Sequence, residues 1–145
     1  MAVLFLPFLA SMGIAIMVID QKILDELTAK AKASPRLRMA YDLRTTPEEN
    51  SQRMLNAIEP GTEIPIHRHW NSSETVLCIR GHFQELLYDN DGNLEEVIDL
   101  VPGGVIVNVP AGQWHNLKSL ESGTILAEAK DGRYQPVSEE DILRK

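Results

Sequence analysis

Hydrophobic and polar residues alternate in short runs through the middle and the second half of the chain, with turn-forming residues between the runs. The runs cover residues 52–58, 65–69, 74–80, 83–88, 94–100, 105–109, 113–119 and 124–129. Residues 90–93, Asn-Asp-Gly-Asn, predict a tight hairpin between two of them. About eight short antiparallel strands with regular turns predict an all-β fold, a small antiparallel β-barrel or jelly roll.

A different period marks the two ends of this β region. In residues 20–33 the apolar positions recur at helical spacing, which predicts an N-terminal helix with Asp20 as its N-cap. The helix should end before Pro35. Residues 138–141, Ser-Glu-Glu-Asp, resemble a capping box and predict a short C-terminal helix. The length fits one domain, which we place at residues 20–145.

Residues 1–19 form an apolar extension without a charged side chain. Its length would allow a membrane span or a signal peptide. The extension lacks the positively charged start of a signal peptide, however, and Pro7 and Gly13 weaken a helix. A third interpretation is that Met17 is the true start of the protein. We expect the third, and therefore no stable association with a membrane.

The charge and the cysteine count exclude some classes of function. A net charge of −7 argues against a nucleic-acid partner, because phosphate backbones require a basic surface. The single cysteine, Cys78, excludes an internal disulfide, in agreement with a cytoplasmic location. Cys78 is expected to be a small buried hydrophobic residue rather than a nucleophile.

The histidines provide the candidate chemistry. His67 and His69 lie two residues apart, so a strand would present both imidazoles on one face. Residues 70–73 are turn-prone and could bring Glu74 back beside them, and His115 follows a second turn-prone segment. Three imidazoles and one carboxylate suit a divalent transition metal (Fe, Mn, Zn, Ni or Co) and would leave two octahedral positions open.

These two stretches resemble the signature motifs of the cupin superfamily. The first motif, G-x5-H-x-H-x4-E-x6-G, is matched at all fixed positions: Gly61, His67, His69, Glu74 and Gly81. The second, G-x5-P-x-G-x2-H-x3-N, is matched by Gly104, Pro110, Gly112 and His115, while Ser119 replaces the usual asparagine. That asparagine is not a ligand, so the resemblance implies one metal held by His67, His69, Glu74 and His115 in a jelly roll.

Residues 52–130 are further similar to the WbuC-type cupin metalloproteins, with residues 60–69 and 128–132 as the most reminiscent segments. That group is associated with bacterial surface-polysaccharide gene clusters. The resemblance implies a link to polysaccharide synthesis. It also implies a homodimer, formed through edge strands or the N-terminal segment.

Two segments contain further candidates for substrate binding. Three arginines within residues 36–44 could bind an anionic substrate, with Arg38 and Tyr41 as candidates. Alternatively, these arginines pair with nearby acids on the surface and Tyr41 only packs. In residues 52–56 one of two faces must line the interior: Gln52, Met54 and Asn56, or Arg53 and Leu55. Arg53 and Asn56 are therefore both candidates.

Gln113 has the same strand parity as His115 and could reach the mouth of the pocket. It could bind a substrate or orient a ligand, or it could be an amide satisfied at the rim.

We expect a small metal-dependent enzyme acting on a sugar or nucleotide-sugar derivative, possibly anionic, by isomerase, epimerase, lyase or dioxygenase chemistry. The alternative is a non-catalytic binding or sensor module in which the metal anchors a small carboxylate or sugar. A purely structural metal is the least attractive interpretation, because such sites are closed and use cysteine.

Overall fold

The computed structural model describes residues 16–144. The predictions for residues 1–15, as signal, anchor or misassigned start, therefore lie outside the described residues. In the described part of the chain, no helix combines the length and the apolar character that a membrane span requires.

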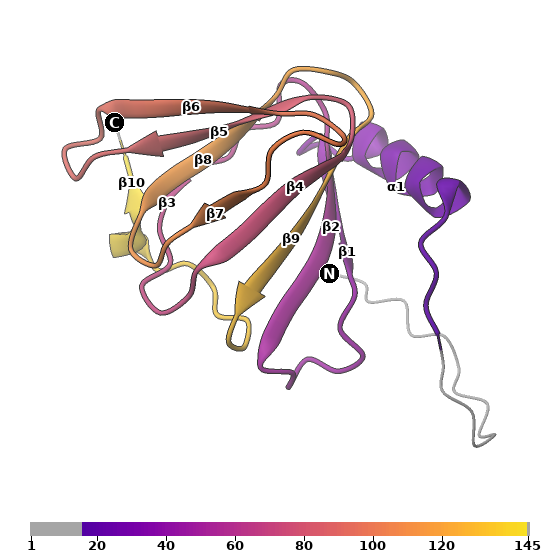
Figure 1. The fold of residues 1–145 in the computed structure, drawn as a ribbon, viewed down its shortest axis with the longest axis horizontal. Coiled ribbons are helices and arrows are strands. Elements are labelled where there is room, and N and C mark those ends of the chain that lie inside the picture. Colours follow the sequence, from indigo (N-terminus) through magenta and orange to yellow (C-terminus); the bar gives the residue numbers. More distant parts are fainter. Residues whose placement is uncertain (1–15, 145) are drawn as a thin grey trace.

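The described residues form two five-stranded antiparallel sheets (Figure 1). The first sheet has the order β1-β2-β9-β4-β7 and the second β10-β3-β8-β5-β6. The strands are β1 (Arg38–Asp42), β2 (Ser51–Ile58), β3 (Ile66–His67), β4 (Glu74–Arg80), β5 (Phe83–Tyr88), β6 (Leu94–Leu100), β7 (Val107–Val109), β8 (Trp114–Ser119), β9 (Thr124–Asp131) and β10 (Ile142–Leu143). The predicted all-β jelly roll is thus present. Among the described residues the two sheets do not close into a barrel, because their edge strands do not pair with each other.

Two strands were not predicted, and both are short edge strands. β1 lies in the arginine-rich segment and pairs with β2. At the other end, Glu139–Asp141 forms only one 3-10 turn, and the next two residues pair with β3, with Ile142 opposite His67. The backbone N–H of Arg68 also donates to the carbonyl of Asp141 (3.1 Å). This pairing draws the chain into an extended strand, so the short C-terminal helix that we predicted is reduced to a single turn.

Helix α1 (Gln21–Ala33) corresponds to the helix expected in residues 20–33. The Asp20 carboxylate accepts a hydrogen bond from the Ile23 N–H (3.0 Å), as an N-cap does. The helix buries one face against the side of the first sheet that is turned away from the second. This cluster contains Leu24, Leu27 and Ala31 of the helix with Leu55, Ala57 and Ile125 of the sheet.

The main core lies between the sheets. It is formed by Ile58, Val76, Cys78, Phe83, Leu100, Val107, Val109 and Leu126. Burial raises the pKa of the Cys78 thiol to about 11, so this residue is an inert part of the core, as expected. Arg80, which strand parity would place inside with Cys78, lies instead beside the helix. A register shift after Cys78 turns it outward, and its guanidinium donates to Asp25 Oδ1 (2.8 Å).

Gly81, the last glycine of the first motif, makes the turn between β4 and β5. Its φ of +77° is in the left-handed region that favours glycine. A Cβ at this position would lie 2.8 Å from the Cα of Thr124. Glycine therefore allows β5 to start directly after the strand that contains Glu74.

Candidate metal centre

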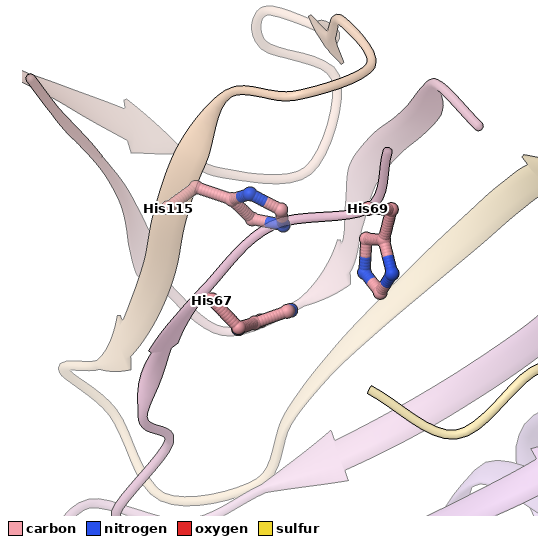
Figure 2. A group of neighbouring side chains, drawn as sticks. All are labelled: His67, His69 and His115. Atoms are coloured by element: carbon pink, nitrogen blue, oxygen red, sulfur yellow. The ribbon is translucent and has the colours of Figure 1, made fainter. Parts of the chain in front are cut away.

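The pairing of β3 with β8 brings the two histidine-containing segments together. His67 lies directly opposite His115 in the strand register, and their ring centroids are 4.5 Å apart. The ring of His69 is 5.0 Å from that of His67 and 5.7 Å from that of His115. Figure 2 shows the three rings converging on one space. One nitrogen from each ring lies within 4.8 Å of the others, a grouping that could hold a metal ion.

Backbone carbonyls orient two of the three imidazoles. Nδ1 of His67 lies 2.9 Å from the carbonyl oxygen of Pro65, and Nδ1 of His115 lies 2.8 Å from that of Gln113. In the neutral ring Nδ1–H then donates to the carbonyl, and the lone pair of Nε2 is left for a ligand. Nε2 of His69 and Nε2 of His115 are buried and have no hydrogen bond of normal geometry with any described residue. A bound metal would satisfy both nitrogens.

Glu74 approaches the imidazoles from the first sheet. Its Oε1 lies 3.1 Å from Nε2 of His115, and its Oε2 lies 3.5 Å from Nε2 of His69. The side chain is buried, yet its pKa is lowered to about 2, because His115 and Lys130 outweigh the effect of desolvation. Glu74 groups with His115 but not with all three imidazoles at once. The structure thus brings the three histidines together and places the carboxylate at their side.

The protonation states also suit a metal. Desolvation lowers the pKa of His67 and of His69 to about 4, so both rings are neutral at pH 7. Metals bind neutral imidazole and ionised carboxylate, which is the state of His67, His69 and Glu74. The pKa of His115 is instead raised, because the hydrogen bond and the charge of Glu74 outweigh desolvation, so a metal would have to displace a proton from this ring. The donor set therefore fits a divalent transition metal.

These lowered pKa values predict how the metal-free protein responds to acid. The unfolded chain takes up protons on these histidines near pH 6.5, whereas the folded chain does so only near pH 4. Between these values the unfolded state binds more protons, so His67 and His69 make the folded state less stable as the pH falls. Urea unfolding in the presence of a chelator measures the free energy of unfolding at pH 7 and at pH 5. Its decrease from pH 7 to pH 5 should be smaller in a His67→Ala/His69→Ala variant than in the wild type. An equal loss in both proteins would contradict the lowered pKa values.

A cavity of about 580 Å³ lies over this cluster. Two predicted substrate-binding residues, Arg38 and Asn56, line it. The open question of parity in β2 is thereby answered: Gln52, Met54 and Asn56 face the cavity. Arg38 donates through Nη1 to the carbonyl of Glu63 (2.7 Å), which holds its guanidinium at the wall.

The other three candidates do not line this cavity. Tyr41 packs against the cluster beneath α1. Arg53 is exposed and pairs with Glu49, because its side of β2 faces away from the cavity. Gln113 is the satisfied rim amide of our alternative interpretation: its Nε2 donates to the carbonyl oxygens of Tyr88 (2.7 Å) and Trp114 (3.0 Å).

Three charged residues that sequence reasoning did not identify lie near the site. Lys130 Nζ is 3.4 Å from Oε2 of Glu74 and 3.7 Å from Oε1 of Glu128. Burial raises the pKa of Glu128 and raises that of Glu85 to about 8. For Glu128 and Lys130 strand parity was an available signal, because they share a face with buried Leu126.

Arg68 connects the C-terminal segment to the site. The guanidinium of Arg68 stacks between two indoles, 3.8 Å from the ring centre of Trp70 and 4.3 Å from that of Trp114. Its Nε donates to Asp141 Oδ1 (2.9 Å). Residues 132–138, just before this contact, form part of the cavity wall. Arg68 therefore links the wall of the cavity to the strand that presents His67.

Comparisons with known proteins support the fold. Residues 19–100 match the family described as "Domain of unknown function (DUF6016)". No curated protein matches the chain significantly.

Among solved structures, an oxalate oxidase in complex with glycolate has 12% identity and a TM-score of 0.61, over 74% of this chain and 57% of that one. KdgF from Halomonas sp. has 19% identity and a TM-score of 0.54, over 70% and 84% of the two chains. The protein TT1209 from Thermus thermophilus has 20% identity and a TM-score of 0.61, over 82% and 100%.

This chain thus spans little more than half the length of the oxalate oxidase. At these identities the likeness concerns the fold alone. The oxalate oxidase and KdgF are cupin-fold proteins, so the cupin fold expected from the two motifs is confirmed.

Proposed function

Because the chain belongs to the DUF6016 family, whose description names no activity, we propose a function from its own site. The protein is a divalent-metal-binding cupin and a small metal-dependent enzyme that acts on an anionic sugar derivative or a small hydroxy acid. One observation carries this proposal: three imidazoles converge beside an accessible cavity, and the buried Nε2 atoms of His69 and His115 face the Glu74 carboxylate without a hydrogen bond of normal geometry to any described residue.

His67, His69, Glu74 and His115 are the proposed metal ligands. A divalent metal bound there would supply Lewis-acid polarisation of a substrate oxygen or activation of a water molecule. The chain's own groups would position the substrate: Arg38 and Asn56 from the wall of the cavity, and Trp70 from its edge. The site resembles an enzyme centre more than a structural metal site, because the imidazoles border a cavity.

The lining of the cavity supports a small anionic substrate. Four cationic side chains line it, Arg38, Arg68, Lys130 and Arg133, together with the acids Glu74, Glu128, Asp131 and Asp141 and with amides that include Gln52, Asn56 and Asn116. Guanidinium and ammonium groups bind carboxylates, and amides bind hydroxyl groups. One neighbour in fold was solved with glycolate, and another is an oxalate decarboxylase from Bacillus subtilis. We therefore extend the proposed substrates from sugar derivatives to small hydroxy acids. The WbuC-like link to surface polysaccharide, the homodimer and the cytoplasmic location remain predictions.

Replacing Arg38 should weaken the binding of such acids. We expect Arg38→Gln to lower the affinity of the metal-loaded protein for glycolate or glucuronate by about 10-fold, the value of one charge-assisted hydrogen bond. Arg53→Gln is the matched control, since Arg53 lies outside the cavity and pairs with Glu49. Isothermal titration calorimetry measures the affinities, and NMR of the incubated acids detects turnover.

Three outcomes are informative. Conversion of an acid supports the enzyme. Binding without conversion supports the binding or sensor module of our alternative hypothesis. An equal loss of affinity in the Arg38 and Arg53 variants would contradict the proposed orientation of the substrate.

A further inference from the structure

Glu85 is a buried acid that neither signature motif contains. Its side chain is 1% exposed, and neither carboxylate oxygen has a hydrogen-bond partner among the described residues. Its neighbours along β5 on the same face, Phe83 and Leu87, belong to or pack against the main core. Burying a carboxylate without a partner is strongly unfavourable, and buried charges are normally paired or bound to metals. The position of Glu85 therefore requires an explanation.

The carboxylate of Glu85 lies next to the candidate metal centre. β5 pairs with β8 so that Leu87 lies opposite His115 and Glu85 lies one pleat deeper, opposite Leu117. One oxygen of Glu85 lies within 4.8 Å of ligand atoms of both Glu74 and His115, and all three side chains are buried. Glu85 does not line the cavity over the histidines. It therefore reaches the centre from the side of the core.

Three carboxylates, those of Glu74, Glu85 and Glu128, lie close together at this point, and among the described residues Lys130 is in contact with two of them. Burial raises the pKa of Glu85 to about 8, so without a metal this carboxyl is neutral at pH 7. A divalent cation bound beside it would favour its ionised form.

We propose that Glu85 is an additional metal ligand, which binds the divalent cation from the core side together with Glu74 and His115. This inference rests on the proposed function, because it assumes that the histidine cluster binds a metal. A second carboxylate makes the donor set richer in oxygen than the three-histidine, one-glutamate set of the motifs. Oxygen ligands favour Mn²⁺, whereas imidazoles alone suit Zn²⁺ well. The centre should therefore depend on Glu85 more for Mn²⁺ than for Zn²⁺.

Competition titration against a fluorescent chelator tests this assignment. We expect Glu85→Gln to lower the affinity for Mn²⁺ by at least about 10-fold, since even groups that only support a ligand contribute that much. The affinity for Zn²⁺ should fall less, because the three imidazoles remain. Glu96→Gln is the matched control: Glu96 lies opposite Leu87 on the neighbouring strand β6 and is exposed. Its affinities should equal those of the wild type.

Thermal unfolding separates a ligand from a structural acid. In chelator, Glu85→Gln and Glu85→Leu should melt at or above the wild-type temperature, because each removes an unpartnered buried acid. With Mn²⁺ added, the wild type should gain more in melting temperature than either variant.

Two results would overturn the assignment of Glu85 without affecting the proposed function. The first is that Glu85→Gln binds Mn²⁺ as tightly as the wild type. The second is that both Glu85 variants fail to fold in chelator, which would indicate a structural acid. A wild-type protein that binds neither metal would overturn the proposed function as well.

Discussion

Replacing both His67 and His69 with alanine is expected to abolish metal binding. The wild type should retain about one metal ion per chain, and the variant should lose more than about 100-fold in affinity, because two of three converging imidazoles are removed. Only His115 would remain of the group whose ring nitrogens lie within 4.8 Å of one another. Elemental analysis of protein purified without added metal or chelator measures the result.

The fourth histidine provides the control for this experiment. Nε2 of His82 lies 2.6 Å from Oδ1 of Asp99 in a partly exposed pair, and His82 is not part of the histidine cluster. His82→Ala should therefore keep its metal. A double variant that retains as much metal as the wild type would refute the assignment of the ligands while leaving the cupin fold intact.

Phe83→Ala should cause a large loss of stability. Phe83 is 0% exposed in the core between the sheets, at the start of the strand that contains Glu85. Removing a buried phenyl ring leaves a cavity and costs about 3–5 kcal/mol. For a chain of this length the melting temperature should fall by roughly 10 °C.

Calorimetry of the metal-free proteins measures the effect of Phe83→Ala, and Val97→Ala is the control. Val97 lies on the neighbouring strand β6 and is exposed, so its truncation should change stability by less than about 0.5 kcal/mol. If Phe83→Ala costs no more than Val97→Ala, the core is not packed as described.

Much of the candidate site follows from residue spacing. The H-x-H spacing predicted that His67 and His69 lie together, and the two motifs add Glu74 and His115. Because β3 ends at His67, the position of His69 comes from the segment just after the strand and not from strand alternation itself. In the structure these four residues do lie together. The spacing of His67 and His69 is local, which is why the sequence was sufficient here. The fold class followed likewise from the regular succession of short strands and turns.

Parity failed where a strand was not regular. Gln113 was expected on the face of His115, but β8 begins only at Trp114, so the alternation does not reach back to residue 113. Arg80 turned outward at a bulge that no residue type announces. The sequence also could not show which face of β2 points toward the cavity. That orientation depends on α1, which covers the face that contains Leu55.

Strand parity could place Glu128 and Lys130 on an inward face, but the contacts of Glu128 and Glu85 with the site depend on strand order. Glu128 and Lys130 reach Glu74 since β9 lies beside β4, a pairing between segments about fifty residues apart that local patterns do not encode. In the sequence, Glu85 has the pattern of an ordinary polar position in an amphipathic strand. Only the second sheet's order, which places β5 beside β8, brings it to His115.

The pairing of distant strands also bears on how quickly the protein acquires its native state. β2 pairs along its whole length with β9, and β3 pairs with β8 through His67 and His115. Early and late parts of the chain must therefore meet before either the cavity wall or the histidine cluster is complete. Loops of this length close at an entropic cost before their contacts form, and folds dominated by such contacts fold in milliseconds to seconds. The imidazoles should therefore assemble late on the folding pathway, after the hairpin of β5 and β6, whose strands are adjacent in sequence.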